Sequence, residues 1–414
     1  MPATYRQVFG RAEFRTLFAS MLVSVAGDQV ARVALSLLVY DRTRSAGWTA
    51  GTYALTYLPS VLAGPLLSGL ADQWPRRRMM IAADLGRAVL VAAMAVPGMP
   101  LPAVAGLLVI VQAAGAPGNA ARAATVAATL ADPEEYLLGK GVLDMLVQLA
   151  QVTGFATGGT LVQFLGPGPA LLADAGTFVV SAVLVRFGIR ARPTPDAPER
   201  AGSRISRWRN DLAAGSALVA RTPKLRSLVA LGCIAGFYVT VEGLAAPYAA
   251  EIGQSAQAVG LLLAASPAGT VAGMAIVARL RAETRLRLLG PLAAAACAPL
   301  VVCAIHPGLA TTILLWAMSG AASSYHLPAS AAFTLALPDH RRAQGFGLAA
   351  TALTTCQGAG IALAGLAAGF TSASTVLAVA GGIGMLAAGA ASAAWSRARR
   401  GTPAAPPNDS VGSA

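Results

Sequence analysis

The stretch Ser68-Gly69-Leu70-Ala71-Asp72-Gln73-Trp74-Pro75-Arg76-Arg77-Arg78 is a polar, basic segment between two long apolar ones. The apolar segments, 48–67 and 79–96, are each close to the roughly 20 residues that a helix needs to cross a bilayer. Adjacent arginines are costly inside hydrocarbon, and short arginine-rich loops stay on the cytoplasmic side of a membrane. The stretch therefore predicts a cytoplasmic loop between two spanning helices.

The composition of the 414-residue chain is that of an integral membrane protein. Charged residues make up 12% and hydrophobic residues 56%, and the mean hydropathy is +0.62. The net charge of +13 would also suit a nucleic-acid binder, but the basic residues are in the wrong places for one. Apart from Arg42 and Arg44 in an outer loop and Arg32, Arg87 and Arg122 in helices, they fall in predicted cytoplasmic segments. This asymmetry is typical of membrane proteins, and we expect no nucleic-acid partner.

Apolar runs and the residues that break them predict twelve spanning helices. They are residues 14–40, 47–71, 78–98, 102–128, 138–165, 168–188, 225–250, 256–280, 286–305, 309–333, 342–369 and 372–395. The first run is too long for a signal peptide, so we expect it to remain as a helix. An even number of spans places both termini in the cytoplasm, which agrees with the arginines near each end. We expect a multi-pass protein of the inner or plasma membrane.

An internal repeat divides the chain. The fourth predicted helix ends Ala128-Thr129-Leu130-Ala131-Asp132-Pro133, and the tenth ends Thr334-Leu335-Ala336-Leu337-Pro338-Asp339. We predict a first six-helix half over residues 1–190, a cytoplasmic linker with an amphipathic segment over 191–223, a second half over 224–397 and a disordered tail over 398–414. Two parallel six-helix repeats are typical of transporters that bind substrate between the repeats near mid-membrane.

The basic loop also resembles a family signature. Leu70-Ala71-Asp72-x-x-Pro75-Arg76-Arg77 is similar to the loop 2–3 signature of the major facilitator superfamily, G-x-L-A-D-R-x-G-R-R/K, from which Ser68, Gln73 and Pro75 depart. The resemblance implies an all-α bundle of two pseudo-symmetric halves that works by alternating access. It further implies a cytoplasmic latch between the halves, formed by Ser68, Gly69, Asp72, Pro75, Arg76 and Arg77. The alternative is that the arginines only set the topology.

Ionisable residues inside the predicted helices are costly in a membrane and are therefore candidates for function. Asp28 lies about 21 Å along the first helix, near the membrane midplane. Arg32 follows it by four residues, so the two can pair on one helix face. Asp84 and Arg87 are placed for a second such pair in the third helix. Each pair is either a proton-coupling site or a structural ion pair.

Other charged residues have less specific surroundings. Glu242 in the seventh helix corresponds in the repeat to Asp28, so we expect either a second acid facing the cavity or an exposed residue near a loop. Arg122, near the inner end of the fourth helix, is expected to extend to the membrane interface. Asp144 and Asp174 are expected nearer the membrane faces.

Three further segments resemble exporters of the same superfamily. Gly154-Phe155-Ala156-Thr157-Gly158-Gly159 is similar to the antiporter signature G-P-x-x-G-G, with Phe155 in place of proline; close helix packing through Gly154, Gly158 and Gly159 is the alternative. Gly27-Asp28-x-x-x-x-x-Ala34-Leu35 and Asp174-Ala175-x-x-Phe178-x-x-Ser181 resemble segments of the macrolide-efflux and siderophore-exporter branch. Val109 occupies the position of the arginine in the family's fourth-helix motif.

These features predict a monomeric secondary transporter that exports small amphipathic molecules, such as antibiotics or secondary metabolites, in exchange for protons. An uptake permease of the same fold is the first alternative, and a membrane-embedded enzyme or sensor is the second. We expect no catalytic activity, cofactor or metal, because the histidines are scattered and the cysteines lack metal-site spacing. The expected partners are the lipid bilayer, a small-molecule substrate and protons. Candidates for the substrate cavity are Gln112, Gln148, Gln151, Tyr238, Trp316 and His326.

Overall fold

The structure, a computed structural model, describes residues 4–59, 61, 67, 74–192, 204–338 and 342–400. Every regular element in this part of the chain is a helix. A helix satisfies its backbone donors and acceptors within one segment, which apolar surroundings require. Before residue 192 the helices are α1 (Tyr5–Gly10), α2 (Ala12–Thr43), α3 (Ala46–Ala54), α5 (Arg76–Met94), α6 (Leu101–Thr129), α7 (Pro133–Leu165) and α8 (Pro167–Gly188).

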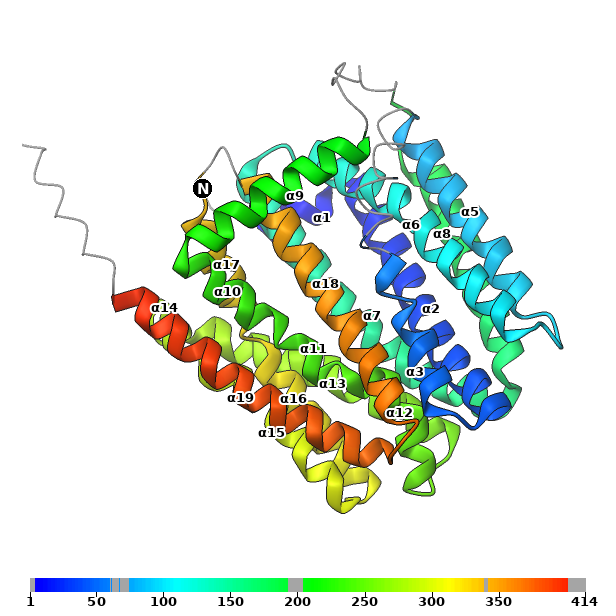
Figure 1. The fold of residues 1–414 in the computed structure, drawn as a ribbon. Coiled ribbons are helices and arrows are strands. Elements are labelled where there is room, and N and C mark those ends of the chain that lie inside the picture. The colour runs from blue at the N-terminus through cyan, green and yellow to red at the C-terminus, as the bar shows by residue number, and fades with distance from the viewer. Residues whose placement is uncertain are drawn as a thin grey trace, which may run out of the picture.

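The later helices begin with one that lies outside the predicted spans. They are α9 (Arg204–Arg221), α10 (Pro223–Cys233), α11 (Ala235–Tyr238), α12 (Thr240–Glu251), α13 (Ala256–Arg279), α14 (Ala282–Arg287), α15 (Leu289–Val301), η2 (Val302–Ile305), α16 (Leu309–Ser323), α17 (His326–Ala336), α18 (Arg342–Ala367) and α19 (Ala373–Arg400). In Figure 1, α1 and α9 lie on one face of the bundle, where α19 also ends. We call this the terminal face.

Eight helical segments of the described chain are long and apolar enough to cross a membrane. They are α2, α6, α7, α8, the run α10–α12, α13, α18 and α19. The other four predicted spans correspond to α3, α5, α15 with η2, and α16 with α17. The structure is therefore consistent with twelve spans and confirms the all-α membrane fold.

Three predicted spans are interrupted. The second stops being regular after Ala54. The next residue, Leu55, is four residues before Pro59, whose nitrogen has no hydrogen to donate to the Leu55 carbonyl oxygen. The tenth breaks at Ser324, four residues before Pro328, for the same reason. The seventh is divided into α10, α11 and α12. Predictions from hydropathy missed these breaks because a proline or a short turn hardly changes the mean hydropathy of a span.

The helices form two groups that meet along a few elements (Figure 1). In the first group, α2 packs against α7 and α8, and α5 packs against α6 and α8. In the second, α13 and α15 pack against α16, and α15 and α10 pack against α19. The groups meet where α7 contacts α13 and where α3 contacts α12 and α18. Any motion of one group relative to the other must break or rearrange these contacts.

Glycines allow α7 to approach its neighbours closely. A Cβ atom at Gly154 would lie 2.8 Å from Cβ of Gln29 on α2, and one at Gly158 would lie 3.0 Å from Cα of Val30. A Cβ atom at Gly159 would lie 2.8 Å from Cα of Gly260 on α13. The three glycines of the antiporter-like segment therefore each lie at a helix contact, and Gly159 lies at a contact between the two groups.

We expect Gly159→Val to push α7 and α13 apart and to lower the thermal stability of the protein. Overpacking of this kind typically costs about 1–3 kcal/mol. Gly141→Val on the same helix is the matched control, because an added Cβ atom there meets nothing within 4 Å. The unfolding temperatures of both purified variants in detergent test this. Equal unfolding temperatures would contradict a close contact at Gly159.

Candidate functional site

Asp28 forms its ion pair with another helix. Its Oδ1 atom lies 2.6 Å from Nη2 of Arg87 on α5, so the predicted pairing with Arg32 is wrong. The Arg87 side chain is 8% exposed, and its guanidinium carbon lies 4.1 Å from the centre of the Phe178 ring on α8. A cation over an aromatic face is attracted by the ring electrons. Arg87 thus joins α2, α5 and α8.

A second carboxylate lies beside this pair. Asp174 on α8 is 1% exposed and interacts electrostatically with both Asp28 and Arg87. Its Oδ1 atom accepts a hydrogen bond of 3.2 Å from the Thr177 hydroxyl. The two helices come together here because Gly27 leaves room for Asp174 and Thr177. Asp174 lies about two turns from the start of α8, as the predicted span 168–188 also placed it.

We call Asp28, Arg87, Asp174 and Phe178 the Arg87 cluster. It contains two carboxylates and one guanidinium. Asp28 is its most accessible carboxylate, with 28% of its side chain exposed, whereas Asp174 is fully buried. Since charges away from water need partners, this cluster is neutral only when it also holds one proton.

The other buried ion pair joins α5 to α6. Arg122 donates from Nη2 to both carboxylate oxygens of Asp84, at 2.6 and 2.5 Å. Ser181 on α8 donates to Asp84 at 2.7 Å. The two charged side chains are 8% and 4% exposed, so Arg122 does not extend to the membrane interface. The predicted pair of Asp84 with Arg87 is also wrong, because each residue has found a charged partner on a facing helix.

Arg32 belongs to a third arrangement, at the contact between the two groups of helices. Its guanidinium carbon lies 5.9 Å from the ring centre of Tyr53 and 5.6 Å from that of Tyr57. The Tyr57 hydroxyl donates to Oε2 of Glu242 on α12 at 2.6 Å. Arg32 also interacts electrostatically with Glu242 and with Asp28. We call Arg32, Tyr53, Tyr57 and Glu242 the Tyr57 cluster.

The position of Glu242 decides between the two expectations for it. Its carboxylate is half-buried and bonded to Tyr57, so it is not an exposed residue near a loop. Because Glu242 and Tyr57 come from different groups of helices, their hydrogen bond links α12 to the segment that follows α3. Arg32 interacts electrostatically with Glu242 in this link and with Asp28 in the Arg87 cluster.

We expect Tyr57→Phe to loosen the contact between the groups without unfolding either. A hydrogen bond to a charged group contributes about 1.5–3 kcal/mol, so the population in which this contact is open should rise roughly ten-fold or more. Spin labels at Arg44 and Gln254, in a background without native cysteines, would report the separation. Tyr136→Phe is the control, because Tyr136 is an exposed tyrosine of α7 that does not belong to the Tyr57 cluster. Identical distance distributions for both variants would contradict a role for the Tyr57 bond.

The basic loop motif is only partly described. Pro75 precedes α5, Arg76 donates to the carbonyl oxygen of Ala124 at 3.0 Å, and Arg77 donates to that of Ile189 at 3.3 Å. Both acceptors belong to the first group of helices. These hydrogen bonds hold α5 to α6 and to the end of α8. They are not the expected contacts between the halves. The motif's Ser68, Gly69 and Asp72 lie outside the described residues.

The predicted cavity residues do not form one site. The structure places Gln112, Gln148 and Gln151 half-buried on α6 and α7. Trp316 is fully buried, with its ring centre 5.9 Å from that of Tyr248, so it packs in the core and does not line a cavity.

Tyr238 and His326 are joined to each other by a hydrogen bond of 2.7 Å. His326 also lines a cavity of about 200 Å³ between α10, α17 and α18. Tyr238 is 9% exposed and lies outside that cavity. Sequence reasoning missed Tyr57 and Tyr53 altogether. Phe178 and Ser181 follow Asp174 by four and seven residues, which places all three on one face of α8, and this spacing is the signal by which the sequence could have grouped them.

A bundle of apolar helices with ion pairs in its interior is the architecture of a multi-pass membrane protein, in which such buried charges often belong to a transport pathway. Residues 17–302 match the model of the Major Facilitator Superfamily, and the chain belongs to that family. Its members are transporters and not enzymes. The family and the apolar helices make the chain a multi-pass membrane protein.

The curated relatives match only part of the chain. This chain is 27% identical over 182 residues to the uncharacterized MFS-type transporter YvqJ of Bacillus subtilis, and the aligned region covers 43% of each chain. It is 32% identical over 91 residues, 21% of each chain, to the uncharacterized MFS-type transporter Rv0037c of Mycobacterium tuberculosis. The chain thus spans less than half the length of these relatives in each match.

Solved structures are similar over nearly the whole chain. The nucleoside transporter NupG has a TM-score of 0.74 at 12% identity, covering 92% of this chain and 100% of that one. A bacterial homolog of the human lysosomal transporter Spinster, inward-facing and occupied, has a TM-score of 0.71 at 14% identity, covering 94% and 96%. A peptide transporter, POT, has a TM-score of 0.71 at 15% identity, covering 94% and 95%. These likenesses show the fold.

Proposed function

We propose that this protein exports small amphipathic molecules in exchange for protons, acting as a monomer in the inner or plasma membrane. The arginines near the terminal face support an orientation with that face and both termini in the cytoplasm. The proposal includes a division into halves over residues 1–190 and 224–397, joined by the linker 191–223. The tail, predicted over 398–414, begins after Arg400, because residues 398–400 continue α19. The antiporter-like glycines of α7 and the exporter-like segments of α2 and α8 support export over uptake.

The observation that carries the proposal is the imbalance of charge in the Arg87 cluster. One guanidinium serves two carboxylates, and the Asp28 carboxylate is the accessible one. When Asp28 gains a proton, its ion pair with Arg87 weakens, and Arg87 is left with Asp174 on α8. When Asp28 loses the proton, the pair that joins α2 to α5 forms again. Proton binding is thereby linked to the packing of α2.

The Tyr57 cluster supplies the connection from that packing to the second group of helices. Arg32 is on the same helix as Asp28 and interacts with Glu242 on α12. A change in the charge of Asp28 therefore changes the field at Arg32, which in turn biases the link between Tyr57 and Glu242. Protonation of Asp28 and opening of the contact between the two groups are thereby coupled equilibria. Alternating access requires such a coupling.

Accumulation of a fluorescent lipophilic cation in cells with and without this protein tests the proposal. We expect lower accumulation in cells that contain the protein, and we expect the difference to disappear when the proton gradient is collapsed. Export that persists without the gradient would overturn proton coupling. Higher accumulation in the cells with the protein would favour an uptake permease. Unchanged accumulation in both conditions would exclude broad export of such cations.

A further inference from the structure

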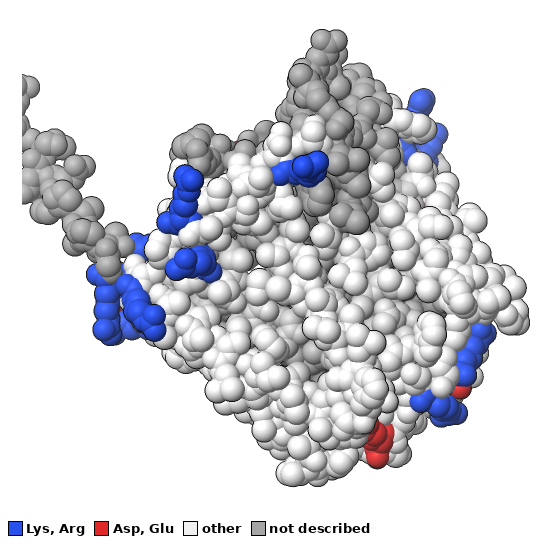
Figure 2. Space-filling model, viewed as in Figure 1, with Lys and Arg blue, Asp and Glu red and all other residues white. Residues whose placement is uncertain are grey.

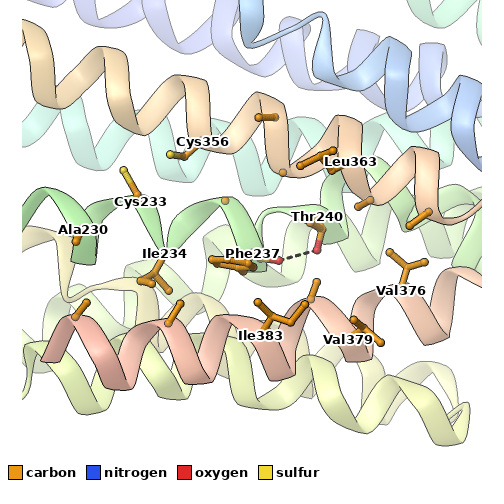
Figure 3. Close-up of a pocket in the computed structure, with 18 of the residues that line it drawn as sticks. Ala230, Cys233, Ile234, Phe237, Thr240, Cys356, Leu363, Val376, Val379 and Ile383 are labelled. Atoms are coloured by element: carbon orange, nitrogen blue, oxygen red, sulfur yellow. Dashed lines mark hydrogen bonds between the residues drawn. The ribbon is translucent and has the colours of Figure 1, made fainter. Parts of the chain in front are cut away.

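An apolar groove runs along the second group of helices, separate from the charge clusters. It lies between α18 and α19, over α10, α11 and α12, and has a volume of about 820 Å³ (Figure 3). Its walls include Ile234, Phe237, Leu363, Val376, Val379 and Ile383. The hydroxyl of Thr240, one of its few polar groups, already donates to the carbonyl oxygen of Phe237 at 2.7 Å. The groove therefore favours an apolar occupant.

The groove opens on the outer surface of the helix bundle, and we infer that this side faces lipid. Its wall residues Leu363, Val379 and Ile383 are 65%, 54% and 50% exposed. None of the residues that line it comes from α2, α3, α5, α6, α7 or α8. An apolar surface of this size that faces the bilayer is covered by the acyl chains of lipids. The groove differs in this respect from a substrate cavity between the two groups of helices.

The length of the groove fits an extended acyl chain. Its lining residues on α19 run from Thr375 to Ala391, which is about 24 Å at 1.5 Å per residue. One leaflet contributes about half of a hydrocarbon core that is roughly 30 Å thick. A single lipid chain that enters near the terminal face therefore runs along most of the groove.

Two arginines lie beyond the end of the groove, on the side of the terminal face. Arg226 precedes the groove residue Ala230 by one turn on α10, and Arg397 follows the groove residue Ala390 by two turns on α19. Both side chains are exposed. Figure 2 shows basic side chains near the ends of α10 and α19, whereas the surface between α18 and α19 is uncharged. An apolar slot with cations at one end matches a lipid with a negative headgroup.

We propose that the groove binds an anionic phospholipid, with one acyl chain between α18 and α19 and the phosphate beside Arg226 and Arg397. Arginine binds phosphate through several N–H donors, and basic residues near a membrane surface attract anionic lipids. The bound chain fills the space between α18 and α19. Because α18 also packs against α3, the lipid supports a wall of the contact between the two groups of helices.

Native mass spectrometry of the purified full chain, in micelles with equal amounts of phosphatidylglycerol and phosphatidylcholine, tests this proposal. We expect the wild type to retain phosphatidylglycerol preferentially. The variant Ala387→Trp fills the groove, so retained phosphatidylglycerol should fall about five-fold or more. The matched control is Ala393→Trp, an exposed alanine of the same helix that does not line the groove, and it should bind like the wild type.

The arginine variants test the headgroup separately and alter only exposed side chains. The preference for phosphatidylglycerol over phosphatidylcholine should fall roughly five-fold for Arg226→Gln and again for Arg397→Gln. The control Arg279→Gln, on α13, should leave the preference unchanged. Equal retention of both lipids by the wild type would overturn the proposal. Equal losses of retained phosphatidylglycerol in Ala387→Trp and Ala393→Trp would also overturn it. So would a dimer of the chain without bound lipid in the mass spectrum.

Discussion

Asp28→Asn is expected to reduce proton-driven export to the level of cells that lack the protein. Asparagine is close in size to aspartate but neither carries a proton nor forms a full ion pair with Arg87, which lies 2.6 Å away in the wild type. The carboxylate that remains in the Arg87 cluster, Asp174, is fully buried, so the cluster has lost the acid that is accessible for exchanging protons. A proton gradient should then no longer change the packing of α2 against α5. Accumulation of the fluorescent cation, with and without the gradient, measures the effect.

Two further variants separate a coupling role from a structural one. Asp144→Asn is the matched control, because Asp144 forms an exposed pair with Lys140 and should be replaceable without loss of export. Asp28→Glu keeps a titratable group and should keep part of the export. Full export by purified and folded Asp28→Asn in vesicles would contradict coupling through Asp28 and leave the Arg87 pair as a structural feature.

The sequence is enough to place charged residues inside helices, but it does not identify their partners. Hydropathy located Asp28, Asp84, Arg87 and Arg122 correctly because a charge stands out in an apolar run. The predicted partners were neighbours on the same helix, since spacing along one helix is all that a single sequence shows. The observed partners depend on which helices face each other, and that depends on tertiary contacts such as the one at Gly27.

The same limit explains the other differences. Trp316 was placed in a cavity by its residue type, but whether an aromatic ring faces a cavity or a core depends on the helix behind it, here the one that carries Tyr248. The link between Tyr57 and Glu242 joins residues 185 positions apart, and no periodic pattern connects them. By contrast, the glycines at 154, 158 and 159 were correctly associated with close packing, because lack of a side chain is a local property that the sequence shows directly.

Arg122→Ala is expected to destabilise the protein by about 3–5 kcal/mol, the usual cost of removing one partner of a buried ion pair. Asp84 would remain buried, and of its present hydrogen-bond partners only the Ser181 hydroxyl would be left. Unfolding of purified protein in detergent, followed by circular dichroism, measures the loss. The control Arg287→Ala breaks an ion pair with Glu283 in which both side chains are 69% exposed, and it should cost no more than about 1 kcal/mol.

A double variant then distinguishes a structural role of the pair of Asp84 and Arg122 from a role in proton coupling. Asp84→Ala with Arg122→Ala removes both charges, so the double variant should be more stable than the sum of the single losses predicts. If the pair is structural, the double variant should also export the fluorescent cation once folded, unlike Asp28→Asn. Loss of export in a folded double variant would instead extend the coupling site from the Arg87 cluster to Asp84 and Arg122. Similar losses of stability for Arg122→Ala and Arg287→Ala would contradict the burial of this pair.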